Sequence, residues 1–152
     1  IYVLLHPNIP IDYIKKACEF WRKYVGFNFT FVTGDTLPSD RVGIWFKDLT
    51  NIDKPSIAAE TALFYNAPPY EISGGEIRLY KGWEGKKESD KIITIAHEIG
   101  HIIFTAPTSG VDGLGHTDTQ DIMHLYAYLP YIHPYEQIAM KIKYNKNPGE
   151  GL

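Results

Sequence analysis

The hydrophobic and polar positions of this chain follow two periods, and the shorter one predicts β-strands. Phe27, Phe29 and Phe31 alternate with two polar residues and a valine. This is the two-residue period of a strand with one buried face. Four further short segments are apolar or alternating and are bounded by turn-forming residues. The predicted strands are residues 1–5, 27–32, 42–46, 58–65 and 76–80. Together they predict a sheet of about five strands.

The longer period predicts a first helix that follows the first strand. Ile14, Cys18 and Trp21 recur at helical spacing and form one apolar face. Asp12 is the expected N-cap, and Gly26 is the expected end of the helix. The sequence therefore predicts an amphipathic helix that packs on the sheet.

Two more helices are predicted nearer the end of the chain. Residues 92–103 are apolar on nearly all faces, which is typical of a buried helix, and Ser89 is its expected cap. Pro134 fits the first position of a final helix, which residues 147–149 would stop. Strands and helices in this arrangement predict an α+β fold, with a single domain that comprises residues 1–152.

Composition narrows the class of protein. The chain is 44% hydrophobic, which is typical of a globular domain. Its net charge is −3, and its lysines and arginines do not cluster as nucleic-acid binding requires. No apolar run approaches the roughly 20 residues that span a membrane. We therefore expect a monomer with no nucleic-acid or membrane partner.

The residues most suggestive of catalysis form the H-E-x-x-H pattern His97-Glu98-Ile99-Gly100-His101. Residues four apart lie on one face of a helix, so His97 and His101 can direct two imidazole nitrogens to one metal ion. Zinc is the expected ion, at about 2.0–2.1 Å from each nitrogen. Glu98 would lie beside the metal and take a proton from the water that zinc activates. The pattern predicts a zinc hydrolase, because two histidines and a glutamate are costly in an apolar helix unless something satisfies them.

A catalytic zinc site needs a third protein ligand and one open position. The best candidate is His116, which follows a glycine-rich stretch. Two alternatives remain open at this point. Asp112 would be the ligand in a class that uses an aspartate, and Glu136 would be the ligand in a thermolysin-like arrangement.

This stretch resembles the zinc motif of the metzincin metallopeptidases, and most closely that of the matrixins. The matching positions are His97, Glu98, Gly100, His101, Leu114, Gly115, His116 and Met123. The matrixin motif is H-E-x-G-H-x-x-G-L-G-H, in which the third histidine follows the second by six residues, whereas His116 follows His101 by fifteen. An insertion of about nine residues, within residues 102–113, would reconcile the two spacings.

The resemblance implies a zinc-dependent endopeptidase that binds one zinc ion through His97, His101 and His116. Glu98 would be the general base, and Met123 would form a turn beneath the metal. The implied fold is a twisted mixed sheet with the zinc-carrying helix, a second packing helix and a C-terminal helix in a small lower lobe. The implied partner is a peptide or protein substrate. The resemblance also suggests a secreted or extracytoplasmic location.

Two further segments are expected to border the substrate cleft. In metzincins the segment that corresponds to residues 58–65 is an antiparallel edge strand, whose free backbone groups can pair with an extended peptide. Its candidate cleft residues are Ala59, Thr61 and Leu63. The resemblance also implies that an aromatic stretch after Met123 forms a wall of the substrate pocket. Its candidate residues are Tyr126, Tyr128 and Tyr131.

One alternative belongs to another functional class. The metal would then only stabilise the fold, and the cleft would capture peptides without cleaving them. The intact Glu98 argues against this reading, and no fourth ligand that would close a structural zinc site is obvious.

Overall fold

The computed structural model describes residues 1–37, 42–65, 72–103 and Ile122. These residues form an α+β fold with a five-stranded mixed sheet and three helices. The elements in chain order are β1 (Tyr2–Leu4), α1 (Ile11–Val25), β2 (Thr30–Val32), β3 (Gly43–Leu49), β4 (Ala59–Tyr65), β5 (Ile72–Tyr80), α2 (Lys81–Glu84) and α3 (Glu88–Ile103). The predicted helix that begins at Pro134 lies outside the described residues.

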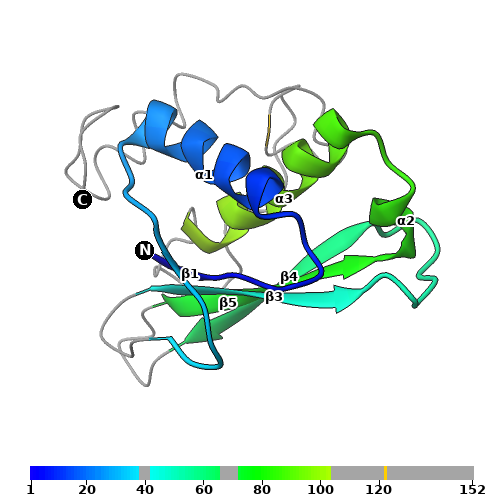
Figure 1. Ribbon diagram of the computed structural model, residues 1–152, viewed down its shortest axis with the longest axis horizontal. Coiled ribbons are helices and arrows are strands. Elements are labelled where there is room, and N and C mark those ends of the chain that lie inside the picture. Colours follow the sequence, from blue (N-terminus) through cyan, green and yellow to red (C-terminus); the bar gives the residue numbers. More distant parts are fainter. Residues whose placement is uncertain (38–41, 66–71, 104–121, 123–152) are drawn as a thin grey trace.

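The sheet has the strand order β2-β1-β3-β5-β4. All neighbouring strands are parallel except β4, which pairs antiparallel with β5 at one edge. Helices α1 and α3 lie side by side on one face of the sheet (Figure 1). No described helix covers the opposite face. The prediction of a strand over residues 58–65 is confirmed, as is its place at an antiparallel edge.

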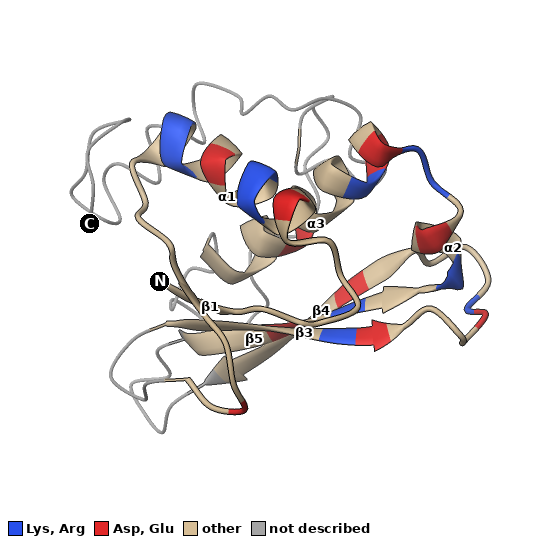
Figure 2. Ribbon diagram, viewed as in Figure 1, with Lys and Arg blue, Asp and Glu red and all other residues tan. Residues whose placement is uncertain are grey.

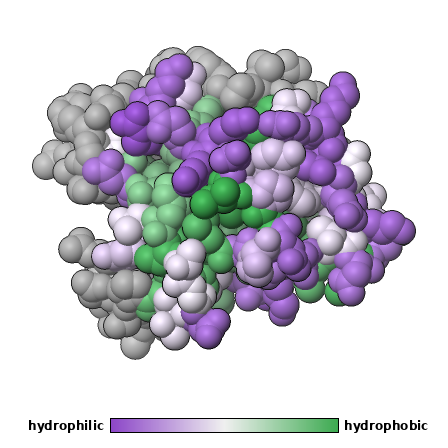
Figure 3. Space-filling model, viewed as in Figure 1, coloured by the Kyte–Doolittle hydropathy of each residue, from purple (hydrophilic) through white to green (hydrophobic). Residues whose placement is uncertain are grey.

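Helix α1 forms as its apolar stripe predicts, because Ile14, Cys18 and Trp21 are all buried. Trp21 also donates from Nε1 to the carbonyl of Ala96 at 2.8 Å, which joins α1 to α3. Gly26 ends the helix in the left-handed conformation, at a φ of 80°. The charged residues of α1 form alternating acidic and basic bands on its outward side (Figure 2). In the same view, apolar side chains lie between this hydrophilic side and the sheet (Figure 3).

The two predicted N-caps, Asp12 and Ser89, are wrong. Helix α1 begins at Ile11 with Pro10 at the N-cap position, so Asp12 lies inside the first turn. The φ of Pro10 is −55°, which already suits the start of a helix without a side-chain cap. Helix α3 begins at Glu88, so Ser89 also lies inside its first turn.

Other boundaries shift for reasons of strand pairing. Strand β2 contains only three residues, because its parallel partner β1 is equally short. Phe27 precedes β2 but is still buried in the core. Strand β3 continues past the predicted end to Leu49, because its polar last residues pair with β5. The short helix α2 was not predicted, since four residues are too few to show a period. None of the described helices is long and apolar enough to cross a membrane.

Candidate active site on helix α3

The two motif histidines lie one turn apart in the second half of α3. His97 is buried and His101 is half-buried. Their Nε2 atoms are 3.1 Å apart, and the two rings are nearly perpendicular. Two ligands at 2.0–2.1 Å from one tetrahedral zinc ion lie roughly 3.3–3.4 Å apart. The two nitrogens therefore already converge at about the spacing that zinc requires.

The orientation of His97 is held from its other ring nitrogen. The Nδ1 atom lies 2.6 Å from the carbonyl oxygen of Ile122, which is fully buried. A carbonyl only accepts hydrogen bonds, so Nδ1 carries the proton and Nε2 presents its lone pair toward His101. This is the support that metal-binding histidines usually have. Sequence reasoning placed Met123 beneath the site but did not identify the carbonyl of the residue before it.

Glu98 follows His97 and extends toward strand β4. Only 5% of the residue is exposed. The Thr61 hydroxyl lies 2.5 Å from Glu98 Oε2 and 3.1 Å from the Glu98 backbone oxygen. Burial raises the pKa of the Glu98 carboxyl to about 7, while the Thr61 hydrogen bond opposes this rise. A carboxyl with such a pKa can both accept and release a proton near neutral pH.

The donor set suits zinc. Imidazole nitrogen is a common zinc ligand, and the pair on α3 has the required spacing. Within the described part of the chain, no group of three histidine, cysteine, aspartate or glutamate side chains gathers at one point. The predicted third ligand His116 lies outside the described residues, and so do the alternatives Asp112 and Glu136.

The predicted cleft residues fall into two groups. Ala59, Thr61 and Leu63 share the face of β4 that is turned toward α3, because side chains alternate along a strand. Ala59 and Leu63 pack against the hydrophobic core. Thr61 is the polar member of this face, and its hydroxyl reaches the Glu98 carboxyl. The sequence predicted Thr61 as a residue of the substrate cleft but did not predict its contact with Glu98. Met123, Tyr126, Tyr128 and Tyr131 lie outside the described residues.

Neither a scan against models of known protein families nor a search among curated proteins finds a match for this chain. The function is therefore inferred from the convergence of His97 and His101 and from the buried carboxyl of Glu98.

Proposed function

We propose that this chain is a zinc-dependent endopeptidase of the metzincin type, most similar to the matrixins. The observation that carries this proposal is the geometry of α3. Two imidazole Nε2 atoms converge at 3.1 Å, and the residue after the first histidine carries a buried carboxyl that the Thr61 hydroxyl contacts. A histidine pair alone would suit a structural site, whereas this carboxyl would give the site a group for proton transfer.

The proposed ligands of the single zinc ion are His97, His101 and His116. The hydrogen bond from His97 Nδ1 to the Ile122 carbonyl supports the role of His97 in this set, because it leaves Nε2 as the ligand atom. It also brings the residue before Met123 against the first ligand, as a turn beneath the metal requires. Zinc held there would act as a Lewis acid on the scissile carbonyl and would make a water molecule more acidic.

Glu98 would carry the proton between the two reacting groups. It would take one proton from the attacking water while the water oxygen bonds to the carbonyl carbon. It would then give this proton to the amine nitrogen as the carbon–nitrogen bond breaks. The products are one carboxylic acid and one amine, and Glu98 returns to its starting state.

The fold supports the same proposal. Strand β4 is antiparallel to β5 and lies at the edge of the sheet, next to α3. An extended substrate would pair with this edge, with its cut bond near Glu98. The finer features of the proposal are a lower lobe with the C-terminal helix and a substrate pocket. Tyr126, Tyr128 and Tyr131 would line that pocket and favour an apolar or aromatic side chain.

Metal analysis tests the ligand set. The purified protein should bind one zinc ion per chain, as measured by elemental analysis and by competition with a chelator. His116→Ala should weaken zinc binding by orders of magnitude, because it removes one of three ligands. Asp112→Ala is the matched control and should leave zinc affinity unchanged.

Two results would contradict the proposal. Loss of zinc in Asp112→Ala but not in His116→Ala would move the chain to a class with an aspartate ligand. A zinc-loaded wild type that cleaves nothing in a diverse peptide library would instead indicate a zinc-stabilised binding module.

A further inference from the structure

The Thr61 hydroxyl joins the edge of the sheet to the motif glutamate, although the two residues are 37 positions apart in the chain. It lies 2.5 Å from Glu98 Oε2 and 3.1 Å from the Glu98 backbone oxygen. A hydroxyl has one proton, so it donates to one of these oxygens at a time. The shorter contact, to an oxygen that carries charge when Glu98 is ionised, is the stronger hydrogen bond.

Packing between α3 and the sheet sets this distance. In the register of the antiparallel pair, Leu63 lies opposite Gly75. A Cβ added at Gly75 would be 2.7 Å from Cγ1 of Ile102 on α3. Glycine therefore lets α3 lie close to β4 and β5. This close approach places the Glu98 carboxyl within reach of a side chain as short as threonine.

We propose that Thr61 is a positioning residue for Glu98, a role that rests on the proposed endopeptidase function. Its hydroxyl holds Oε2 and thereby fixes the plane of the carboxyl group. With Oε2 held in this way, Oε1 is the oxygen that we assign to proton transfer. Thr61 itself touches neither substrate nor metal in this role.

The chemistry at this position distinguishes positioning from simple packing. The neighbours on the same face, Ala59 and Leu63, are apolar and pack on the core. Valine has nearly the shape of threonine and would fill the same space. A buried carboxylate without a donor is costly, and a buried carboxyl without a fixed partner can adopt several rotamers. The hydroxyl adds a fixed orientation that packing alone does not give.

The test compares Thr61→Val, which removes the hydroxyl, with Thr61→Ser, which keeps it. In the zinc-loaded enzyme, Thr61→Val should lower kcat by roughly tenfold to a hundredfold, the usual range for one hydrogen bond to a charged group. KM should change little, because the substrate does not contact this side chain. Thr61→Ser should recover kcat to within about threefold of wild type, since the donor is restored. Thr94→Val is the matched control, because the Thr94 hydroxyl bonds to the Asp90 carbonyl on the same helix, away from Glu98.

Two further readouts do not depend on activity. Zinc affinity should be equal in wild type and Thr61→Val, because Thr61 does not contact the histidines. A crystal structure of Thr61→Val should show the Glu98 carboxyl in a changed rotamer or in several rotamers. Far-ultraviolet circular dichroism confirms that each variant is folded. If Thr61→Val does not fold, Thr61→Ala replaces it as the variant without the hydroxyl. A kcat for Thr61→Ser that is roughly tenfold or more above that of Thr61→Ala would then support the positioning role, and equal kcat values would overturn it.

The outcomes separate this inference from the proposed function. An active wild type with an equally active Thr61→Val would overturn the positioning role alone. Thr61→Ser as slow as Thr61→Val would also overturn it, because the retained hydroxyl would then not preserve kcat. A wild type that binds zinc but cleaves no peptide would overturn the proposed function and this inference with it.

Discussion

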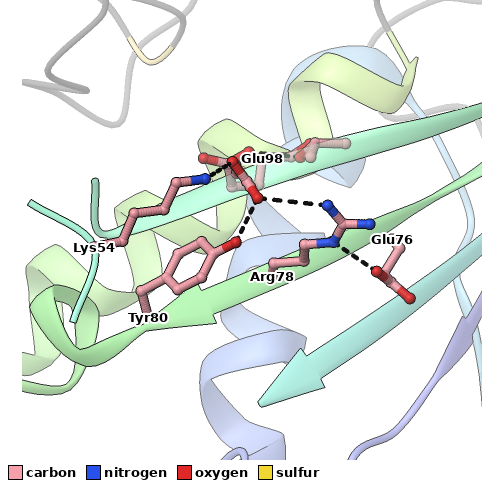
Figure 4. Close-up of polar contacts among 7 residues, drawn as sticks. Lys54, Glu76, Arg78, Tyr80 and Glu98 are labelled. Atoms are coloured by element: carbon pink, nitrogen blue, oxygen red, sulfur yellow. Dashed lines mark hydrogen bonds and ion pairs between the residues drawn. The ribbon is translucent and has the colours of Figure 1, made fainter. Parts of the chain in front are cut away.

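Glu60 on β4 and Glu98 on α3 lie on opposite faces of strand β4, and their surroundings have opposite effects on the pKa values of their carboxyl groups. Glu60 is on the face turned away from α3, because side chains alternate along a strand and Thr61 faces Glu98. Glu60 accepts hydrogen bonds from Lys54 and Tyr80 and pairs with Arg78 at 3.5 Å. Figure 4 shows the side chains of Lys54, Tyr80 and Arg78 with the dashed lines that mark these contacts. The hydrogen bond from Lys54 is the main reason that the pKa of Glu60 is below its usual range. Glu98 has one described side-chain donor, Thr61, and its burial raises its pKa to about 7.

The difference shows what makes a carboxylate suitable for proton transfer. Two cations and a phenol hold Glu60 as a fixed charge, so it links the β3–β4 segment to strand β5. Glu98 lies in an apolar environment that disfavours its charged form. Neighbouring carboxyl groups with pKa values shifted in opposite directions can perform different tasks in one protein. Three predictions examine this contrast.

The largest expected effect is on catalysis. Glu98→Gln should lower kcat by roughly 10²–10⁴, because an amide cannot accept the proton from water. Its zinc content should remain that of wild type, since Glu98 is not a ligand. Glu60→Gln, the same change on the other side of β4, should alter kcat by less than about threefold. Steady-state kinetics on a cleaved peptide, with metal analysis of each variant, would measure both effects. Equal losses in the two variants would contradict the division of roles.

The second prediction concerns the stability of the metal-free protein. The pKa of Glu98 in the folded state is about 7, above its usual 4.5. Protonated Glu98 therefore favours folding below about pH 4.5, and this contribution is lost as pH rises through 7. Glu98→Gln has no such proton to lose. It should be more stable than wild type by roughly 3 kcal/mol or less at pH 8, and nearly equal to it at pH 4.5.

Urea unfolding of both metal-free proteins between pH 4.5 and 8 would measure this difference. A chelator keeps the zinc site from affecting the result. A stability difference that does not change with pH would show that Glu98 is not protonated in the folded protein, and that its burial is offset by other groups.

The sequence predicted those features of the fold and of the candidate site that depend on local spacing along the chain. The i, i+4 interval places His97 and His101 on one face of α3, and their Nε2 atoms do converge. A largely apolar segment that ends at turn-forming residues was sufficient to predict the strand over residues 58–65. The apolar stripe of α1, with buried Cys18, was likewise readable from its period.

The parts that sequence did not predict depend on neighbours that are distant in the chain. The hydrogen bond from Thr61 to Glu98 joins residues 37 positions apart, and the contact of His97 with Ile122 joins residues 25 positions apart. No periodicity reports which strand a helix packs against. The wrong N-cap prediction for α1 has a local cause, because Pro10 begins this helix by its fixed φ rather than by a side-chain hydrogen bond.

The smallest expected effect is on stability at the outward side of β4. The lowered pKa of Glu60 means that its charge stabilises the folded state above the usual pKa of 4.5. This contribution is lost as pH falls through the lower pKa of the folded state. At pH 7, Glu60→Gln should therefore reduce the free energy of unfolding by about 1 kcal/mol, because Lys54 and Arg78 are partly exposed and solvent screens them.

A control variant on the surface of α1 distinguishes the group of contacts around Glu60 from an isolated ion pair. Among the described residues, Glu19 forms an ion pair only with Arg22, across one turn of α1, and its side chain is 59% exposed. Glu19→Gln should cost no more than about 0.5 kcal/mol, since exposed pairs of this kind contribute little. Urea unfolding of both variants at pH 7 and at pH 3, with and without added salt, would test the order of the two effects. If Glu19→Gln cost as much as Glu60→Gln, Glu60 would be an ordinary surface charge, and its three partners would add nothing to the stability of β4.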